Sequence, residues 1–538
     1  MISIYKAKYL ISRGDSMGVL NEEIVLDFYL NKVEEGEINF LKRRENYILK
    51  VKEYINELKK SKEIHDKIQV AKELWKVLFE SAMSYIDPDK RGYNDLFEFF
   101  DAYVDFEELI FASDSFYRDH TLHCLWVYFL QEYITRNSEF SYLTRNINED
   151  IQLLTKMKYI LEEINLPDIF ADTTEKIDKL IKMNDNADSI RCISALSHDL
   201  GYPLKKIKKI NKNIKGILPY FSIENYNEFD FKFDDTQTYF IENFLKLLSN
   251  EIKFYLNINN EKINKLPENI RKIINNIIKI ENTDINNIDQ INIEKGKIKN
   301  LSEDEKKLLK KIFKVNQSLV KNVTSFLRYS NDFEKFEHGI MSAFLLVKTI
   351  KTFRHKKYSY IDNKNINFEQ FNITKIGTYQ DILQAIADHT SDSYQIQAID
   401  DFSALLTFTD ELEEFSRISR ADQNRQFINE FCKTDIHVED GVLHINFIFD
   451  NKEFSNIQPE LAFKGRCKRF LTLFNIADLD EKLILNLKCI GKLPYDKNTY
   501  ELELRKKYVN IKINGVEQNI PDYLNDRQFY TKEEYMKL

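Results

Sequence analysis

Histidines and carboxylates in short apolar stretches are the residues of this chain whose types could bind a metal. Six positions have this setting: His123, His198, Asp199, His338, His389 and Asp410. An imidazole or carboxylate in an apolar environment loses hydration worth on the order of several kcal/mol unless another group compensates for it. A bound divalent cation is the simplest compensation, so these positions predict a buried metal site.

The spacing of apolar residues indicates that helices carry these side chains. His123 shares a helical face with Val127 and Ile134, so its imidazole should point inward. His198 and Asp199 follow a run of small and apolar residues and come just before a Gly and a Pro. Because Gly and Pro end helices, the pair should lie near the last turn of a helix.

The remaining three positions also lie on predicted apolar helices. His338 begins one that can pack closely on a neighbour through Gly339 and Ala343. His389 ends the next apolar helix along the chain. Asp410 follows apolar residues at helical intervals, so its carboxylate should project from an otherwise apolar face and should need a partner.

The order and context of these residues resemble the HD superfamily of metal-dependent phosphohydrolases, named for the pair seen here as His198 and Asp199. The resemblance covers roughly residues 115 to 420, and residues 410–417 resemble the acidic-aromatic-Arg ending of several bacterial HD proteins. It implies these ligands: His123, His198, Asp199 and Asp410 for one ion, with His338 and His389 added for a second ion and Asp199 bridging both.

This ligand set also indicates a chemistry. Mixed imidazole and carboxylate ligation suits Mn²⁺, Fe²⁺, Zn²⁺ or Co²⁺ better than Ca²⁺, and the sequence does not choose among these ions or exclude Mg²⁺. Two ions about 3.5–4 Å apart can lower the pKa of a shared water and clamp the attacking and leaving oxygens of a phosphoryl centre. Metal-dependent hydrolysis of a phosphoester is therefore the expected reaction.

Four residues are candidates for catalytic roles. Asp199 is one, as the bridging ligand implied by the resemblance. His120 lies one helical turn before His123, and an imidazole can donate a proton to a leaving alkoxide. Related cyclic-nucleotide phosphodiesterases place a proton-donating His shortly before the first ligand, although a partly exposed His120 is an equal alternative. Lys205 and Arg417 are candidates for phosphate binding, with a solvated surface role as the alternative for each.

The expected substrate is a nucleotide or a cyclic (di)nucleotide phosphodiester, because the two-metal His set of this superfamily is associated with phosphodiesterases. A nucleotidase or a deoxynucleoside triphosphate triphosphohydrolase of the same fold is the nearest alternative. A di-iron HD-type oxygenase would use the same ligands on a polyol or phosphonate. The last alternative is a non-catalytic ligand sensor that binds metal without turnover.

The chain divides into regions of different pattern, and its predicted fold class is mainly α. Residues 1–110 read as Lys/Glu-rich amphipathic helices, and 111–425 as the helical HD domain. An Asn/Ile/Lys-rich insertion occupies about 250–330. Helical structure without a specific function, here called helical padding, is expected there, and a lid or an oligomer contact is the alternative. In residues 430–538 the spacing of apolar residues changes to the period of a strand, and this pattern predicts a small α+β domain.

The C-terminal region contains the strongest short-range turn signal of the chain. Asp440-Gly441 between apolar runs predicts a β-hairpin. The further elements expected are a helix at about 460–474 and strands at about 483–490, 500–504 and 508–513. Nothing here carries recognisable chemistry, and the remaining histidines have no ligand-like setting: His65, His355, His437 and His444.

Composition limits the classes of partner and location. The 538 residues are 43% hydrophobic, which is enough for a sizeable core. The net charge of −8 gives no global basic surface for binding nucleic acid, but it does not exclude a local basic channel. Five cysteines without CxxC spacing indicate neither a disulfide framework nor a structural zinc site. With no signal-peptide pattern and no apolar run of about eighteen residues, we expect a soluble cytoplasmic protein without a membrane partner, as a monomer or homo-oligomer.

Overall fold

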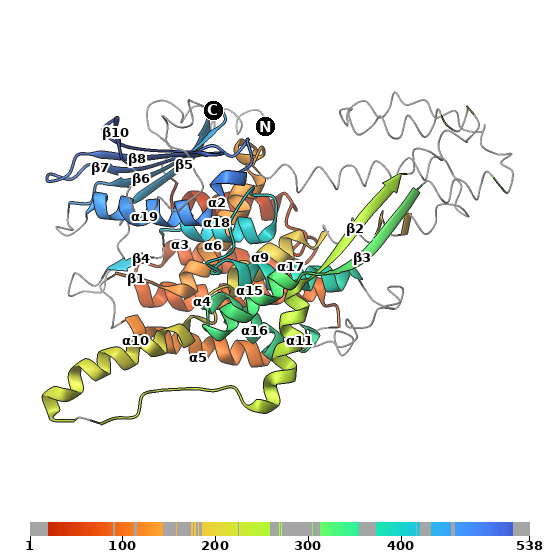
Figure 1. The fold of residues 1–538 in the computed structure, drawn as a ribbon, viewed down its shortest axis with the longest axis horizontal. Helices are drawn as coiled ribbons and strands as arrows, with labels where there is room; N and C mark the ends of the chain where they lie inside the picture. Colours follow the sequence, from red (N-terminus) through yellow and green to blue (C-terminus); the bar gives the residue numbers. More distant parts are fainter. Residues whose placement is uncertain are drawn as a thin grey trace.

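Helices form the body of the molecule, and a six-stranded sheet lies against one end of it (Figure 1). The computed structural model describes residues 20–89, 92–111, 116–143, 185–223, 225–258, 313–353, 373–415, 417–419, 432–452 and 458–519, with isolated positions at 158, 174, 175, 177, 178, 181, 268, 271 and 304. The prediction of a mainly helical chain with a C-terminal α+β region is confirmed.

Four helices lie in the described part of the N-terminal region, as predicted. They are α2 (Glu22–Glu34), α3 (Glu45–Lys60), α4 (Ile64–Ile86) and α5 (Asn94–Phe111). Trp75 of α4 is fully buried and stacks on Phe100 of α5, with 3.9 Å between the ring centroids. Its indole N–H donates to the backbone carbonyl of Leu196 at 2.7 Å. The N-terminal helices therefore pack directly on the helix that precedes the His-Asp pair.

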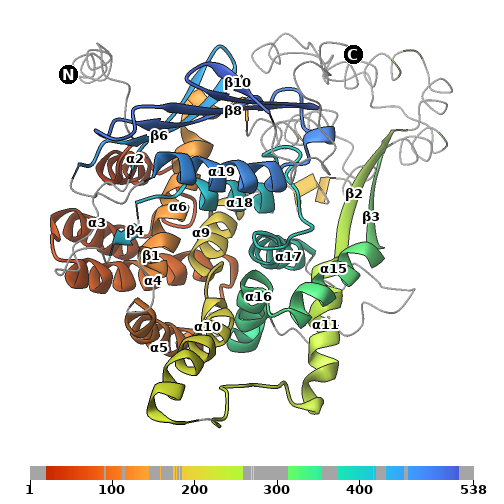
Figure 2. The ribbon, with the colours of Figure 1, turned by 60° about the vertical axis from the view of Figure 1, so that its left-hand side comes forward.

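That helix, α9 (Ala187–Ser197), is the centre of the helical body. Each of its residues is buried, because the helix packs against α4 and three other helices of the body. Small residues such as Ala195 permit this close approach. Figure 2 shows α9 enclosed by its neighbours. The other helices of the body are α6 (His120–Arg136), α10 (Tyr202–Ile217), α11 (Thr238–Ser249), α15 (Val323–Glu334), α16 (His338–Thr349), α17 (Ile373–Asp388) and α18 (Phe402–Leu412).

The segment predicted as helical padding contains two strands instead. β2 (Asn250–Ile258) and β3 (Phe313–Lys321) pair antiparallel along their full length and project from the body as a ribbon (Figure 1). Ile252, Phe254 and Leu256 alternate with polar residues, and this period of two is typical of a strand. The helical expectation for 250–330 is therefore wrong for these two strands and agrees with α15 from Val323 onward, while most of 259–312 lies outside the described residues.

The C-terminal sheet matches the predicted elements closely. Its strands are β5 (Lys433–Glu439), β6 (Val442–Phe449), β7 (Leu485–Gly491), β8 (Thr499–Arg505), β9 (Tyr508–Ile513) and β10 (Val516–Gln518), in spatial order β10-β9-β8-β7-β6-β5. The predicted hairpin is confirmed, with φ values of 51° at Asp440 and 77° at Gly441. Among the described strands of this sheet, β6 and β7 pair in parallel, and α19 (Pro459–Leu473) makes the crossover between them.

Short elements complete the described fold. β1 (Phe116–Arg118) pairs with β4 (Arg417–Ser419) and so joins the start of α6 to the chain after α18. The 3₁₀ helices are η1 (Ser138–Phe140), η2 (Leu218–Phe221), η3 (Asp235–Gln237), η6 (Lys351–Phe353) and η9 (Ile476–Asp478). Within the described ranges, no helix combines the length and the apolar character that crossing a bilayer requires.

Candidate metal centre

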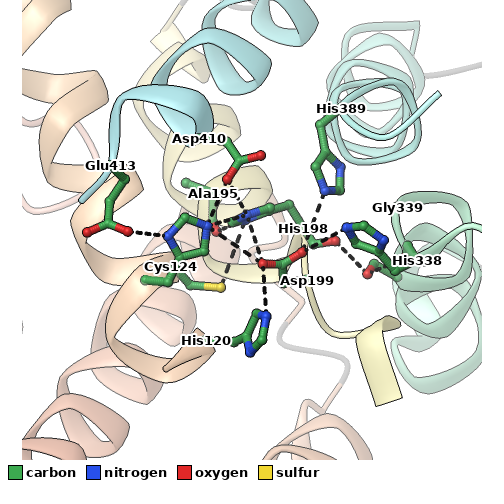
Figure 3. Close-up of polar contacts among 12 residues, drawn as sticks. His120, Cys124, Ala195, His198, Asp199, His338, Gly339, His389, Asp410 and Glu413 are labelled. Carbon is green, nitrogen blue, oxygen red and sulfur yellow. Dashed lines mark hydrogen bonds and ion pairs between the residues drawn. The ribbon is translucent and has the colours of Figure 1, made fainter. Parts of the chain in front are cut away.

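The six predicted ligands converge on one place, and they lie on or directly after five different helices. Figure 3 labels five of them: His198, Asp199, His338, His389 and Asp410. His123 lies in α6, His198 caps the C-terminus of α9 and Asp199 follows it. His338 begins α16, His389 comes directly after α17, and Asp410 lies in the last turns of α18: the predicted helical positions are therefore observed.

One cluster of ligand atoms surrounds the Nε2 atom of His198. The Nε2 atoms of His198 and His123 are 3.3 Å apart, and His123 Nε2 lies 2.8 Å from Asp410 Oδ1. Asp199 Oδ2 is 3.4 Å from His198 Nε2 and 3.7 Å from His123 Nε2. The ligand atoms of His123, His198 and Asp410 all lie within 4.8 Å of one another, which is close enough for one ion to contact all three.

The second cluster uses the other oxygen of Asp199. Asp199 Oδ1 lies 3.2 Å from His338 Nε2 and 3.7 Å from His389 Nε2. The ligand atoms of His198, Asp199 and His389 also lie within 4.8 Å of one another. The two carboxylate oxygens of Asp199 therefore face different imidazoles, so Asp199 could contribute an oxygen atom to either cluster.

Hydrogen bonds fix the orientation of three of the imidazoles. His198 Nδ1 donates at 2.7 Å, and His389 Nδ1 at 2.6 Å, to the backbone carbonyl three residues earlier in each helix. His123 Nδ1 lies 2.6 Å from the fully buried carboxylate of Glu413. Each of these contacts places the ring proton on Nδ1 and leaves the Nε2 lone pair for a metal, as in known carboxylate–histidine–metal arrangements.

Unsatisfied atoms at the site test whether a metal fits. Among the side chains that the structure describes, His389 Nε2 and His338 Nδ1 are buried polar atoms without a hydrogen-bond partner. Because His389 Nδ1 already donates, its Nε2 is an acceptor that lacks a donor. Buried polar groups of this kind are uncommon and often mark a missing ion or water. The imidazole and carboxylate donors suit a divalent transition ion, so the residues fit such a group.

The electrostatics favour the neutral forms of His198 and His338 and the charged form of Asp199. Burial, helped by the nearby imidazole of His389, lowers the pKa of His198 to about 4, and burial also lowers the pKa of His338. Burial alone would raise the pKa of Asp199, but the histidines around it bring that pKa well below its usual value. Neutral imidazole and ionised carboxylate are the forms that bind metals.

His120 lies beside this centre and is not the partly exposed residue of the alternative interpretation. It is 4% exposed, and its Nε2 lies 3.9 Å from Asp199 Oδ2. Glu107 of α5 holds the other side of the ring, with Oε1 2.6 Å from His120 Nδ1 and Oε2 accepting the backbone N–H of His120 at 2.8 Å. Asp119 caps the helix as expected, accepting from the backbone N–H of Leu122 at 2.9 Å.

The two phosphate-binding candidates differ in how far the structure describes them. Lys205 is half-exposed on α10, and its Nζ lies 2.8 Å from Glu337 Oε2, next to His338. This contact places Lys205 at the rim of the second cluster. The backbone of Arg417 is in β4, opposite Arg118 of β1, and its side chain lies outside the described residues.

Sequence reasoning missed the residues that support the ligands from behind. Glu413 lies one helical turn after Asp410, and this spacing could have indicated that both carboxylates face His123. No local signal distinguishes Glu107 from other acidic residues in its helix. Asp388, beside His389, accepts from Arg328 Nη2 at 2.7 Å and is held by a contact that only folding creates.

A cavity of about 650 Å³ lies elsewhere, between the helical body and the C-terminal sheet. Its lining includes Tyr394, Asp401, Asp478, Asp480 and Lys506, and none of the six ligands. Because acidic side chains predominate in this lining, the cavity is not suited to a phosphoester.

Comparisons with family models, with curated proteins and with solved structures find no match to this chain. The interpretation of the centre therefore depends on its own geometry. That geometry consists of a buried set of His and Asp side chains that could hold metal ions.

Proposed function

We propose that this chain is an HD-type metal-dependent phosphohydrolase that acts on a nucleotide or cyclic (di)nucleotide phosphodiester. The observation that carries the proposal is the position of Asp199, whose Oδ2 faces His198 and His123 while its Oδ1 faces His338 and His389. A single carboxylate shared by two imidazole sets is the arrangement expected of a two-metal hydrolytic centre.

Each group at the centre has a separate task in this proposal. One ion would be held by His123, His198, Asp199 and Asp410, and a second by Asp199, His338 and His389. Bound divalent ions would supply Lewis acidity and a lowered pKa for water at the phosphorus. Burial of the ligands keeps bulk water from competing for them and strengthens electrostatic interactions with the phosphoester.

His120 supplies the proton that the leaving alkoxide requires. Glu107 contacts its Nδ1 at 2.6 Å, so the ring is held with Nε2 on the side of Asp199, where the substrate must approach. The carboxylate of Glu107 stabilises the imidazolium before proton transfer, in the way that a buried carboxylate supports a catalytic histidine. This pair favours hydrolysis over the oxygenase alternative, which needs no proton donor for an alkoxide.

The test is elemental analysis of the chain purified without added metal, followed by assays with Mn²⁺ against bis(p-nitrophenyl) phosphate and a panel of nucleotides. Bound divalent metal with phosphoester turnover is the expected result. Asp199→Ala should lose metal and turnover together, while His65→Ala, which removes an exposed histidine, should keep both. Two irons without turnover would indicate the oxygenase, metal without any turnover would indicate the sensor, and a chain that binds no metal would refute the proposal.

A further inference from the structure

A second group of metal-binding side chains lies on the C-terminal sheet. His437 of β5 and His444 of β6 are directly opposite each other, and their rings are stacked with 5.0 Å between centroids and 8° between planes. Glu439 lies two residues after His437 and so on the same face of the strand. The ligand atoms of these three residues lie within 4.8 Å of one another. The sequence suggested no ligand-like setting for the two histidines, because strand register decides which residues meet.

We propose that His437, Glu439 and His444 bind one divalent transition ion, with Zn²⁺ as the best match, at a site separate from the centre in the helical body. Two imidazoles and one carboxylate form a common three-ligand zinc set that leaves a fourth position open. The sheet carries α19 on its other side, where the buried residues of β7 pack (Figures 1 and 2). The three ligands are only partly buried or exposed, so an ion can reach them from solvent.

Asp435 supports His437 from behind, as the carboxylate partner of a metal-binding histidine does. Its Oδ2 lies 3.1 Å from His437 Nδ1, and the residue is 1% exposed. The same carboxylate accepts from Asn446 Nδ2 at 2.9 Å, so its position is fixed. A proton held on His437 Nδ1 leaves Nε2 as the metal-binding atom, and contacts of this type orient the ring and raise its basicity.

One further feature of this face agrees with an ion. Asn446 lies two residues after His444 on the same strand face, and its Oδ1 is a buried acceptor without a hydrogen-bond partner in the described structure. A hydrated ion beside the histidine pair would supply the polar partner that this oxygen lacks.

The position of the site suggests what an ion would do there. The N–H of Val438, between His437 and Glu439, donates to Glu139 Oε1 at 2.9 Å. Glu139 belongs to η1, which follows the helix that carries His123. An ion held by both strands would fix the β5–β6 hairpin where it meets the helical body.

The test uses the full chain without an affinity tag, carrying Asp199→Ala to remove ions from the helical centre and stripped of metal with a chelator. Calorimetric titration with Zn²⁺ should then show one ion per chain, and Co²⁺ should give the visible absorption of a low-coordinate site. Adding His437→Ala or His444→Ala should abolish both signals. Asp435→Asn should weaken binding by about 10- to 100-fold, as expected for loss of a supporting carboxylate. His65→Ala is the matched control and should change neither signal.

The inference is wrong if the Asp199→Ala chain binds no Zn²⁺, or if the number of Zn²⁺ ions bound per chain is the same with and without the histidine substitutions. Should Asp199→Ala fail to fold, the zinc content of the otherwise unaltered chain can be compared with that of His444→Ala. Loss of one ion per chain supports the site, and equal content contradicts it. Phosphoester turnover is not measured in either experiment, so this result is independent of the proposed function.

Discussion

At the level of single residues, His120 should separate catalysis from metal binding. Its Nε2 lies 3.9 Å from Asp199 Oδ2, close to the ligands but outside the two clusters. We expect His120→Asn to retain the metal content and lower kcat by about 10²–10⁴-fold, the range typical for loss of a general acid. Metal analysis and kinetics on the same preparation check this. A variant that loses its metal would show that His120 is structural.

Glu107 should affect catalysis through His120, since its carboxylate contacts both the ring Nδ1 and the backbone N–H of that residue. We expect Glu107→Gln to lower kcat less than His120→Asn does. The double substitution should be no slower than His120→Asn alone, because residues that act as one unit are not additive. A double variant whose losses multiply would show that Glu107 has an effect independent of His120.

At the level of helices, the contact between α16 and α17 sets the second ligand cluster. A Cβ atom added at Gly339 would lie 2.5 Å from the carbonyl oxygen of Ile386 and 2.9 Å from His389 Cε1. Gly339→Ala must therefore push the helices apart, at a cost of about 1–3 kcal/mol typical of overpacking, and displace His389. We expect reduced metal content and a lower urea midpoint.

Gly216 in α10 provides the matched control for this prediction. An added Cβ there meets no atom within 4 Å. Gly216→Ala should leave the metal content unchanged and alter the free energy of unfolding by less than about 1 kcal/mol, because alanine suits a helix better than glycine. Equal metal content in the two variants would contradict the role assigned to the α16–α17 contact.

Buried charge holds α6 against α9. Glu132 is fully buried and accepts from Arg191 Nε at 2.7 Å and from Arg136 Nε at 2.6 Å. Glu132→Ala would leave the buried Arg191 without that partner, so we expect a loss of about 3–5 kcal/mol in the free energy of unfolding. The control is Glu460→Ala, which breaks an exposed pair with Lys464 and should cost about 0–1 kcal/mol.

The same network predicts a dependence on pH. Burial alone would raise the pKa of Glu132, but Arg191 and Arg136 outweigh it, and the pKa in the folded chain lies below its usual value. Its contribution to stability is therefore full at neutral pH and is lost as the pH falls through that lowered pKa. The stability difference between the unsubstituted chain and Glu132→Ala, measured by urea unfolding, should shrink in acid; a constant difference would contradict the assignment.

At the level of the whole molecule, metal binding should stabilise the fold, because the two clusters join five helices that are distant in sequence. An unfolded chain cannot bring these ligands together, so bound ions stabilise only the native state. At an ion concentration 100 times Kd, the gain is about 2.7 kcal/mol per site. Mn²⁺ should raise the Tm of the chelator-treated protein, and Asp199→Ala should show little or no rise.

Turns and helices with a clear local pattern of turn residues or apolar spacing could be predicted from the sequence. The Asp440-Gly441 turn and the helix at α19 are observed where expected, because turn chemistry and apolar spacing act over a few residues. The β2–β3 ribbon shows the limit: composition suggested helical padding, whereas pairing between distant strands, visible only in the fold, gives antiparallel β-structure.

For the candidate metal centre, residue type and apolar context were enough to select six His and Asp positions that the structure brings together, because a buried imidazole or carboxylate needs compensation wherever it lies. Contacts between side chains that are not adjacent in the sequence are visible only in the folded structure. These are the contacts of Glu107 with His120, of Glu413 with His123, and of the stacked rings of His437 and His444. Such contacts depend on strand register and on how helices pack, and a few ångströms decide whether two groups interact.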